Sequence, residues 1–239
     1  MVNGNKRSLA LGIVMSLLFL SMFGSVGFVS ADDVTVTFSG ITNPSSTHKA
    51  VYYLNTSASA WATSGTEFST ANYGNVVTLD GTTTDTTLTG DGYLFLRFDF
   101  NLSPIMATNG ISIEDISSVY LRYDGYGTRI YAGDYSLASA LYNSSGGSWQ
   151  TSDSGGVTGV WSHTSATIDD LYLTIPDANV STFIDKTTYY GLSYTVRTAY
   201  DDGAQKRIYT DRIYVTITYT PSLTAPSLVS PTSGGTGYS

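Results

Sequence analysis

A strict alternation of apolar and polar residues restricts the fold of this chain more than any other feature of its sequence. The clearest instance is 93–102, where every second residue is large and apolar: Leu94, Leu96, Phe98, Phe100 and Leu102. The same two-residue period returns over 116–123 and 212–219. Successive side chains of an extended strand point to opposite faces, so this period predicts half-buried β-strands, whereas an amphipathic helix needs spacings of three and four. The chain is therefore expected to fold mainly into strands.

Shorter segments of the same character are separated by turn residues such as Asp80-Gly81. The strands expected from these patterns are 34–38, 48–54, 75–79, 93–102, 116–123, 137–142, 148–150, 171–175, 192–198 and 212–219. One short helix is expected over 177–186, because Asp177 can cap it and Val180 and Phe183 share a face. About ten short strands without a long helix predict an all-β fold, an antiparallel β-sandwich of the jelly-roll type.

The N-terminal segment has the three parts of a secretory signal peptide. Lys6 and Arg7 precede an apolar run over 9–29, and Val29-Ser30-Ala31 supplies the small residues of a cleavage site. We therefore expect a signal-peptide helix over 1–31 and a sandwich domain over 32–219 in an extracellular location, secreted or on the cell surface. The apolar run is long for a signal peptide, so an uncleaved membrane anchor is the alternative.

The last segment of the chain, 220–239, differs in composition from the expected strands. Pro221, Pro226 and Pro231 are separated by serine, threonine and glycine residues. This composition is typical of an extended linker. The segment is expected to be such a linker, or the truncated start of a following immunoglobulin- or fibronectin-like module.

Charge and reactive residues exclude several functions. The chain has 11 lysine and arginine residues against 19 aspartate and glutamate residues, a formal net charge of −8, which argues against a nucleic-acid partner. It has no cysteine, and neither His48 nor His163 has a second ligand at metal-binding spacing. A glycosidase needs only two carboxyl groups, so the sequence leaves that activity open. We expect a chain that is not itself an enzyme, although it would suit an accessory domain of a larger one.

Several short stretches resemble a known group of secreted domains. The segment 116–121 is followed by 140–143 and by Ser148-Trp149, and 209–216 forms a closing strand. In this order they resemble jelly-roll domains of archaeal and bacterial cell-surface proteins, the DNRLRE group among them. The resemblance implies a sandwich similar to a carbohydrate-binding module, used as an accessory or adhesive domain.

Aromatic residues beside polar loops are the candidate ligand-binding residues. Trp149 and Trp161 flank the loop 151–160, which is rich in glycine, serine and threonine, and Tyr126 and Tyr131 flank another loop. The apolar faces of sugar rings stack on aromatic side chains, while their hydroxyl groups pair with polar groups at the rim. The alternative is that both tryptophans cap the ends of the hydrophobic core.

Acidic turns are the candidate metal site. Asp201 and Asp202 lie in one turn, with Asp211 a short distance further along the chain. Several oxygen ligands at flexible spacing suit calcium, so these residues are candidates for a structural calcium ion. The alternative is that aspartate and glycine simply form hairpin turns here. No other cofactor is expected.

Four Asn-X-Ser/Thr sequons are candidates for glycosylation. Their asparagines are Asn55, Asn101, Asn143 and Asn179. Serine and threonine are abundant in this chain, so some sequons are expected by chance. The four are compatible with an exposed surface protein.

Together these features predict a non-catalytic, secreted or cell-surface β-sandwich module that is adhesive or binds polysaccharide. Its partners would be polysaccharides or surface glycans, with membrane contact only through an uncleaved signal or a downstream region. The alternative is a structural subunit of an envelope layer or filament, in which 34–38 adds to the sheet of a neighbouring subunit. We expect 34–38 to pair within its own domain instead.

Overall fold

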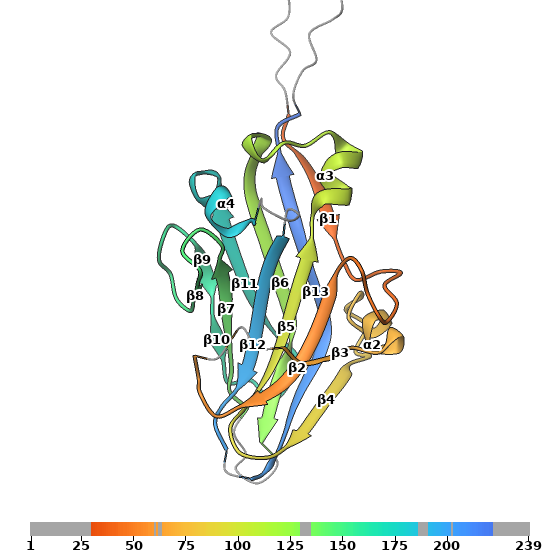
Figure 1. The fold of residues 1–239 in the computed structure, drawn as a ribbon, viewed down its shortest axis with the longest axis vertical. Helices are drawn as coiled ribbons and strands as arrows, with labels where there is room; N and C mark the ends of the chain where they lie inside the picture. Colours follow the sequence, from red (N-terminus) through yellow and green to blue (C-terminus); the bar gives the residue numbers. More distant parts are fainter. Residues whose placement is uncertain are drawn as a thin grey trace, which may run out of the picture. The chain divides into compact units, whose positions relative to one another are not determined.

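The computed structural model describes residues 30–59, 61, 64–129, 135–185, 191–201 and 203–221. They form two antiparallel sheets packed face to face (Figure 1). Sheet A has the order β1 (Asp32–Val36), β13 (Gln205–Tyr219), β6 (Ile116–Arg129), β11 (Asp169–Pro176) and β9 (Thr158–Val160), and β4 (Thr84–Thr89) also pairs with β13. Sheet B has the order β10 (Ser162–His163), β7 (Leu137–Asn143), β12 (Gly191–Thr198), β5 (Tyr93–Asn101), β2 (Lys49–Asn55) and β3 (Thr66–Glu67), and β8 (Ser148–Gln150) also pairs with β7.

This arrangement confirms the predicted all-β antiparallel sandwich. From β4 to β7, each strand lies in the sheet opposite to the one before it, and the same is true from β8 to β13. Connections that cross repeatedly between two sheets are typical of jelly rolls. All of the predicted signal peptide except Ser30 and Ala31 lies outside the described residues, and so does nearly all of 220–239.

The short helices differ in part from the prediction. The expected helix is present as α4 (Asp177–Phe183), although its N-cap is Pro176 and Asp177 makes no capping hydrogen bond. Two further helices, α2 (Thr70–Asn75) and α3 (Ser103–Asn109), and the 3₁₀ turn η1 (Ile113–Asp115) were not predicted. Among the described residues, no helix has the length and apolar character needed to span a lipid bilayer.

The predicted strand over 75–79 is wrong. The hydroxyl of Ser69 accepts a hydrogen bond from the backbone N–H of Asn72 and so begins α2, which runs to Asn75. Val76 then enters the core as part of a turn and is fully buried. The strands β3, β4, β9 and β10 were missed because they are very short or, in β4, because threonines occupy the buried positions: Thr84 and Thr86.

The hydrophobic core lies between the sheets, on the faces that the alternation predicted. In β5, Leu94, Leu96, Phe98 and Phe100 are fully buried. Phe98 lies near the rings of Phe38, Phe68 and Tyr123, with centroid distances of 5.9, 6.0 and 6.0 Å. These aromatic contacts join residues from both sheets and from two connecting segments, so Phe98 is a central packing residue of the sandwich.

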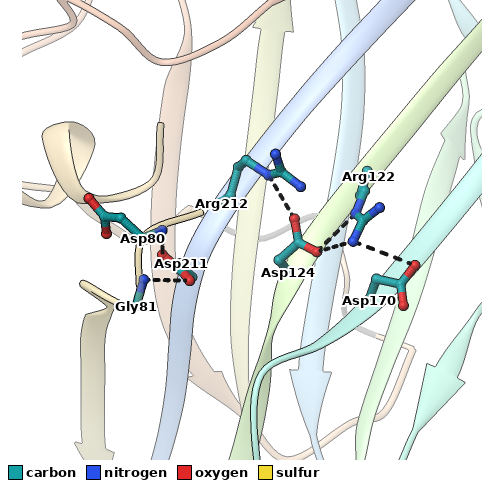
Figure 2. Close-up of polar contacts among 7 residues, drawn as sticks. All are labelled: Asp80, Gly81, Arg122, Asp124, Asp170, Asp211 and Arg212. Atoms are coloured by element: carbon teal, nitrogen blue, oxygen red, sulfur yellow. Dashed lines mark hydrogen bonds and ion pairs between the residues drawn. The ribbon is translucent and has the colours of Figure 1, made fainter. Parts of the chain in front are cut away.

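Two buried carboxylates lie in sheet A near a β-bulge of β13, and Figure 2 shows their polar contacts. The bulge falls between Thr210 and Arg212, at Asp211, whose buried carboxylate accepts a hydrogen bond from the backbone N–H of Gly81 at 3.1 Å. On the outer face, the carboxylate of Asp124 lies between the guanidinium groups of Arg122 and Arg212. The bulge shifts the alternation by one residue, so the buried residues of β13 are even-numbered before it (Ile208, Thr210) and odd-numbered after it (Ile213, Val215).

The first strand of the described domain pairs with the last. In β1, Asp32 lies opposite Tyr219 and Val36 lies opposite Val215 of β13. Of the segment 34–38, expected to pair within its own domain, residues 34–36 do so, and the strand ends before Thr37 and Phe38. Addition of this strand to another subunit would require it to leave β13. The first and last strand residues of the domain, Asp32 and Tyr219, therefore lie side by side, and the chain enters and leaves the sandwich at one end of the sheets (Figure 1).

Candidate functional site

The outer face of sheet B carries a second aromatic cluster, separate from the core. In β5, the side chain of Phe95 points away from the other sheet, because it alternates with Leu94 and Leu96, yet it is fully buried. Its ring is stacked on Tyr53 at 5.1 Å and meets Trp61 edge to face at 5.3 Å. We call the group of Tyr53, Trp61, Tyr93, Phe95, Ala140 and Trp149 the outer aromatic cluster.

Trp149 extends the outer aromatic cluster toward the β8 edge of the sheet. Its strand pairs with β7 so that Trp149 lies opposite Tyr142, and the two rings are 5.1 Å apart. It packs against the buried residues of the cluster, among them Ala140 on the neighbouring strand β7. The guanidinium of Arg97 lies 5.8 Å from the Trp149 ring. Trp149 is therefore a half-buried residue of a sheet face and does not cap the main core.

A cleft of about 420 Å³ opens beside this cluster. Trp61 and Ser59 line it from the connection between β2 and β3, and Trp161, Ser162 and Thr151 line it from the β10 edge. Between them, Ala138 of β7 and Arg197 of β12 are register partners and also line it. We call this space the sheet B cleft. It combines indoles, hydroxyl groups and one guanidinium, which is the composition expected of a small-molecule site.

Arg197 is held in the sheet B cleft by aromatic rings. Its guanidinium carbon lies 5.0 Å from the Trp61 ring centroid and 4.5 Å from that of Tyr93, both within the range of a cation–π contact. One terminal nitrogen donates a hydrogen bond to the backbone oxygen of Thr198 at 3.3 Å. Burial lowers the pKa of Arg197, partly offset by Tyr93, but a guanidinium remains protonated at neutral pH.

Trp161 lies where the chain crosses from sheet A to sheet B, between β9 and β10. Its indole N–H donates a hydrogen bond to the carboxylate of Asp153 at 2.5 Å, and its backbone oxygen accepts one from the N–H of Ser139 at 2.8 Å. The same carboxylate accepts a hydrogen bond from the N–H of Gly159. Asp153 thus fixes both the indole and the loop that precedes β9.

The structure brings together only part of the predicted aromatic site. Trp149 and Trp161 both belong to sheet B and its β10 edge, and Trp161 lines the cleft. Tyr126 belongs to β6 of sheet A, where its ring is stacked on Tyr209 at 4.5 Å. Tyr131 lies outside the described residues. Tyr126 therefore lies on a different sheet from Trp149.

The candidate calcium ligands have different surroundings. The carboxylate of Asp211 accepts hydrogen bonds from the backbone of Asp80 and Gly81, whereas that of Asp201 lies 3.9 Å from Arg129. Asp202 lies outside the described residues. Within the described part of the chain, no three histidine or acidic residues are grouped closely enough to hold a metal ion. Calcium binding stays a prediction.

Three of the sequon asparagines accept hydrogen bonds that stabilise turns at strand ends. Asn55, Asn101 and Asn143 accept side-chain hydrogen bonds from the backbone N–H groups of Ser57, Ser103 and Gly146, at 2.9, 3.1 and 2.6 Å. Such contacts are typical of turns that begin with asparagine. The fourth, Asn179, lies in α4. Glycosylation of these residues stays a prediction.

Trp61 and Arg197 are among the lining residues of the cleft that the sequence analysis missed. Trp61 lies in a segment rich in alanine, serine and glycine, much like the loop between Trp149 and Trp161, and that similarity was a usable signal. Arg197 had no such signal, because its place beside Trp61 depends on the pairing of β12 with β5.

A smaller cavity of about 270 Å³ lies between β1 and α3 and is lined by His48, Asn101 and Ile105. The His48 ring lies against Phe38 and Phe100, and its Nδ1 accepts a hydrogen bond from the backbone N–H of Asn101. Burial lowers the pKa of His48, which favours the neutral form. These contacts give His48 a structural role.

Comparison with known proteins gives a fold-level likeness. No protein-family model and no curated protein matches the chain. Among solved structures, the xylan-binding module CBM15 is similar, with a TM-score of 0.36, 15% identity, and coverage of 81% of this chain and 99% of that one. The CBM22-1 xylan-binding domain of Paenibacillus barcinonensis Xyn10C is also similar, with a TM-score of 0.35, 12% identity, and coverage of 79% and 96%. At these values the likeness says nothing about the ligand of this chain, and membership of the DNRLRE group stays a hypothesis.

Proposed function

We propose that the sandwich domain is a non-catalytic polysaccharide-binding module and that the sheet B cleft holds the glycan. The supporting observation is that Trp61 and Trp161, from connections far apart in the sequence, line one cleft together with Arg197 and hydroxyl side chains. Indole rings pack against the apolar faces of sugars, and hydroxyl and guanidinium groups pair with sugar oxygens. The outer aromatic cluster would extend this surface toward Trp149.

Binding without catalysis fits the chemistry of the cleft lining. Glycoside hydrolysis normally needs two carboxyl groups on either side of the scissile bond. The described lining residues carry no carboxyl group. On the adjoining sheet face, Asp99 is paired with Arg97 at 2.8 Å and Glu67 with Lys49 at 3.5 Å. Incubation of the domain with a bound polysaccharide is expected to release no reducing sugar.

The binding test compares three single substitutions in a domain comprising residues 32–219. Trp161→Ala is expected to weaken polysaccharide binding by about tenfold, because it removes a partly exposed indole from the cleft. Trp61→Ala is expected to weaken binding less and to destabilise the outer aromatic cluster, because Trp61 is only 5% exposed. Tyr126→Ala, on sheet A, is the matched control and is expected to bind as the unsubstituted domain does. Binding is measured by affinity electrophoresis and calorimetry on a panel of soluble polysaccharides, with circular dichroism to check folding.

Other outcomes of this test would contradict the proposal in distinct ways. Loss of binding in Tyr126→Ala alone would show that the binding site lies on sheet A. Undiminished binding in both tryptophan variants would show that the cleft is not the binding site. Failure of the unsubstituted domain to bind any polysaccharide would overturn the proposed function itself.

We also propose that the domain acts outside the cell, secreted or at the cell surface. Support comes from the sequence, where the charged residues Lys6 and Arg7, the apolar run and Val29-Ser30-Ala31 follow the order of a secretory signal. The protein isolated from its native source is expected to begin at Asp32. N-terminal sequencing that finds Met1, or a start within the apolar run, would contradict this expectation.

A further inference from the structure

Arg197 is charged and half-buried, and among the described residues no carboxylate forms an ion pair with it. In the described part of the chain, its guanidinium donates a hydrogen bond to the neutral backbone oxygen of Thr198, and its buried Nε has no acceptor. Fully buried arginines are almost always paired, because removing a charge from water is unfavourable unless a counter-charge or strong acceptor replaces the water, and half-burial carries part of the same cost. The cleft thus contains a positive charge that contacts aromatic rings and has no carboxylate partner among the described residues.

The other cations on the same sheet face do have partners. Lys49 lies 3.5 Å from Glu67, and the terminal nitrogen of Arg97 lies 2.8 Å from Asp99. Both pairs lie outside the lining of the sheet B cleft. Among the described residues of this face, the positive charge without a carboxylate partner is therefore that of Arg197, inside the cleft.

We propose that the ligand of the sheet B cleft is an acidic polysaccharide and that a uronic-acid carboxylate of this ligand pairs with Arg197. The proposal rests on the polysaccharide-binding function above and specifies its ligand. A guanidinium presents parallel N–H groups whose geometry matches the two oxygens of a carboxylate. A neutral sugar can accept hydrogen bonds from Arg197, but it leaves the charge uncompensated.

The surroundings of Arg197 hold its guanidinium ready for such a partner. Trp61 and Tyr93 contact it at 5.0 and 4.5 Å, and the hydrogen bond to Thr198 restrains one terminal nitrogen. A side chain restrained before binding loses little rotational freedom when the ligand arrives. An incoming carboxylate thus meets a restrained donor within a cleft whose indoles contact the rest of the sugar.

The acidic character of the whole chain does not prevent this pairing. The formal net charge is −8, but charges further away than the screening length of about 8 Å at physiological ionic strength are largely screened. Asp153 is the acidic group placed beside the cleft by its contact with Trp161, and its carboxylate already accepts two N–H groups. The negative charge of Asp153 repels the carboxylate of the ligand and offsets part of the attraction to Arg197. We therefore expect a moderate preference of about tenfold for acidic over neutral polymers.

The experiment measures binding of residues 32–219 to three uronans, polygalacturonate, alginate and glucuronan, each beside its carboxyl-reduced counterpart of the same length. The reduced polymers keep the sugar rings and linkages but lack the charge. At least one uronan is expected to bind about tenfold more tightly than its reduced form. That preference is expected to shrink between about 50 and about 500 mM NaCl, because salt screens the ion pair.

Variants locate the preference at Arg197. Arg197→Gln is expected to bind the acidic and reduced polymers equally, and Arg197→Lys to keep part of the preference, since it keeps the charge and loses the paired donors. Arg97→Gln, which removes the arginine paired with Asp99, is the matched control and is expected to keep the preference. Thermal unfolding of each variant checks that the sandwich is intact.

The outcomes separate this inference from the proposed function. Equal binding of acidic and reduced polymers by the unsubstituted domain would overturn the inference and leave the function in place, whereas no binding to either kind would overturn both. If Arg197→Gln still prefers the acidic polymer, another residue causes the preference, and the inference is overturned. Dextran sulfate is the final comparison, and binding as tight as that of the best uronan would show general anion binding rather than carboxylate recognition.

Discussion

Replacing Phe98 by alanine is expected to lower the free energy of unfolding by about 3–5 kcal/mol. Phe98 is fully buried between the sheets and contacts the rings of Phe38, Phe68 and Tyr123. The substitution removes apolar surface and leaves a cavity that rigid neighbouring rings cannot fill. Urea unfolding of residues 32–219, followed by tryptophan fluorescence, gives the change from the transition midpoint and its slope.

Phe98→Leu is the matched variant, since it keeps most of the buried volume and is expected to lose about 1–2 kcal/mol. A loss of less than about 1 kcal/mol for Phe98→Ala would show that the surrounding rings can collapse into the space. It would contradict the central packing role that the ring contacts give this residue.

Replacing Asp124 by asparagine is expected to lower the free energy of unfolding by about 2–3 kcal/mol. The carboxylate is 2% exposed, and the Nε atoms of Arg122 and Arg212 each donate a hydrogen bond to it at 2.9 Å (Figure 2). Without it, two guanidinium groups on adjacent strands lose their shared counter-charge. These groups are 30% and 24% exposed, so water compensates them in part, which places the loss below that of a fully buried pair.

Asp170→Asn is the matched control for this effect. The Asp170 carboxylate is 35% exposed and lies 3.9 Å from Arg122, so its removal is expected to cost less than about 0.5 kcal/mol. Similar losses for the two substitutions would contradict the central role given to Asp124. Both variants are compared by urea unfolding at the same ionic strength, because salt weakens the contribution of the exposed pair more than that of the buried one.

The alternation of apolar residues was enough to predict the sandwich. Leu96 and Phe98 were assigned to one apolar face of their strand from spacing alone, and both are fully buried. The helix α2 was missed because it is short, and its formation depends on the Ser69 cap and on burial of Tyr73 against residues far away in the sequence. Short helices of this kind are stabilised by packing, which a local pattern does not contain.

The candidate site was less predictable than the fold, because it depends on which strands become neighbours. Trp149 and Trp161 stood out as aromatic residues beside polar loops, and both lie on or at the edge of sheet B. Tyr126 had the same local features, but β6 joined sheet A. Arg197 lies beside Trp61 only because β12 and the β2–β3 connection meet across β5. A local stretch of sequence does not show which strands become neighbours.

The pairing of β1 with β13 also determines how the domain responds to pulling. Since Asp32 lies opposite Tyr219, a force applied through the two ends of the sandwich acts at one end of this antiparallel pair. The hydrogen bonds between the two strands then carry the load one after another, as in a zipper, and β1 is the first strand to come away. Sheet B contains neither of these terminal strands, so separation of β1 under tension leaves the strands that line the cleft in place.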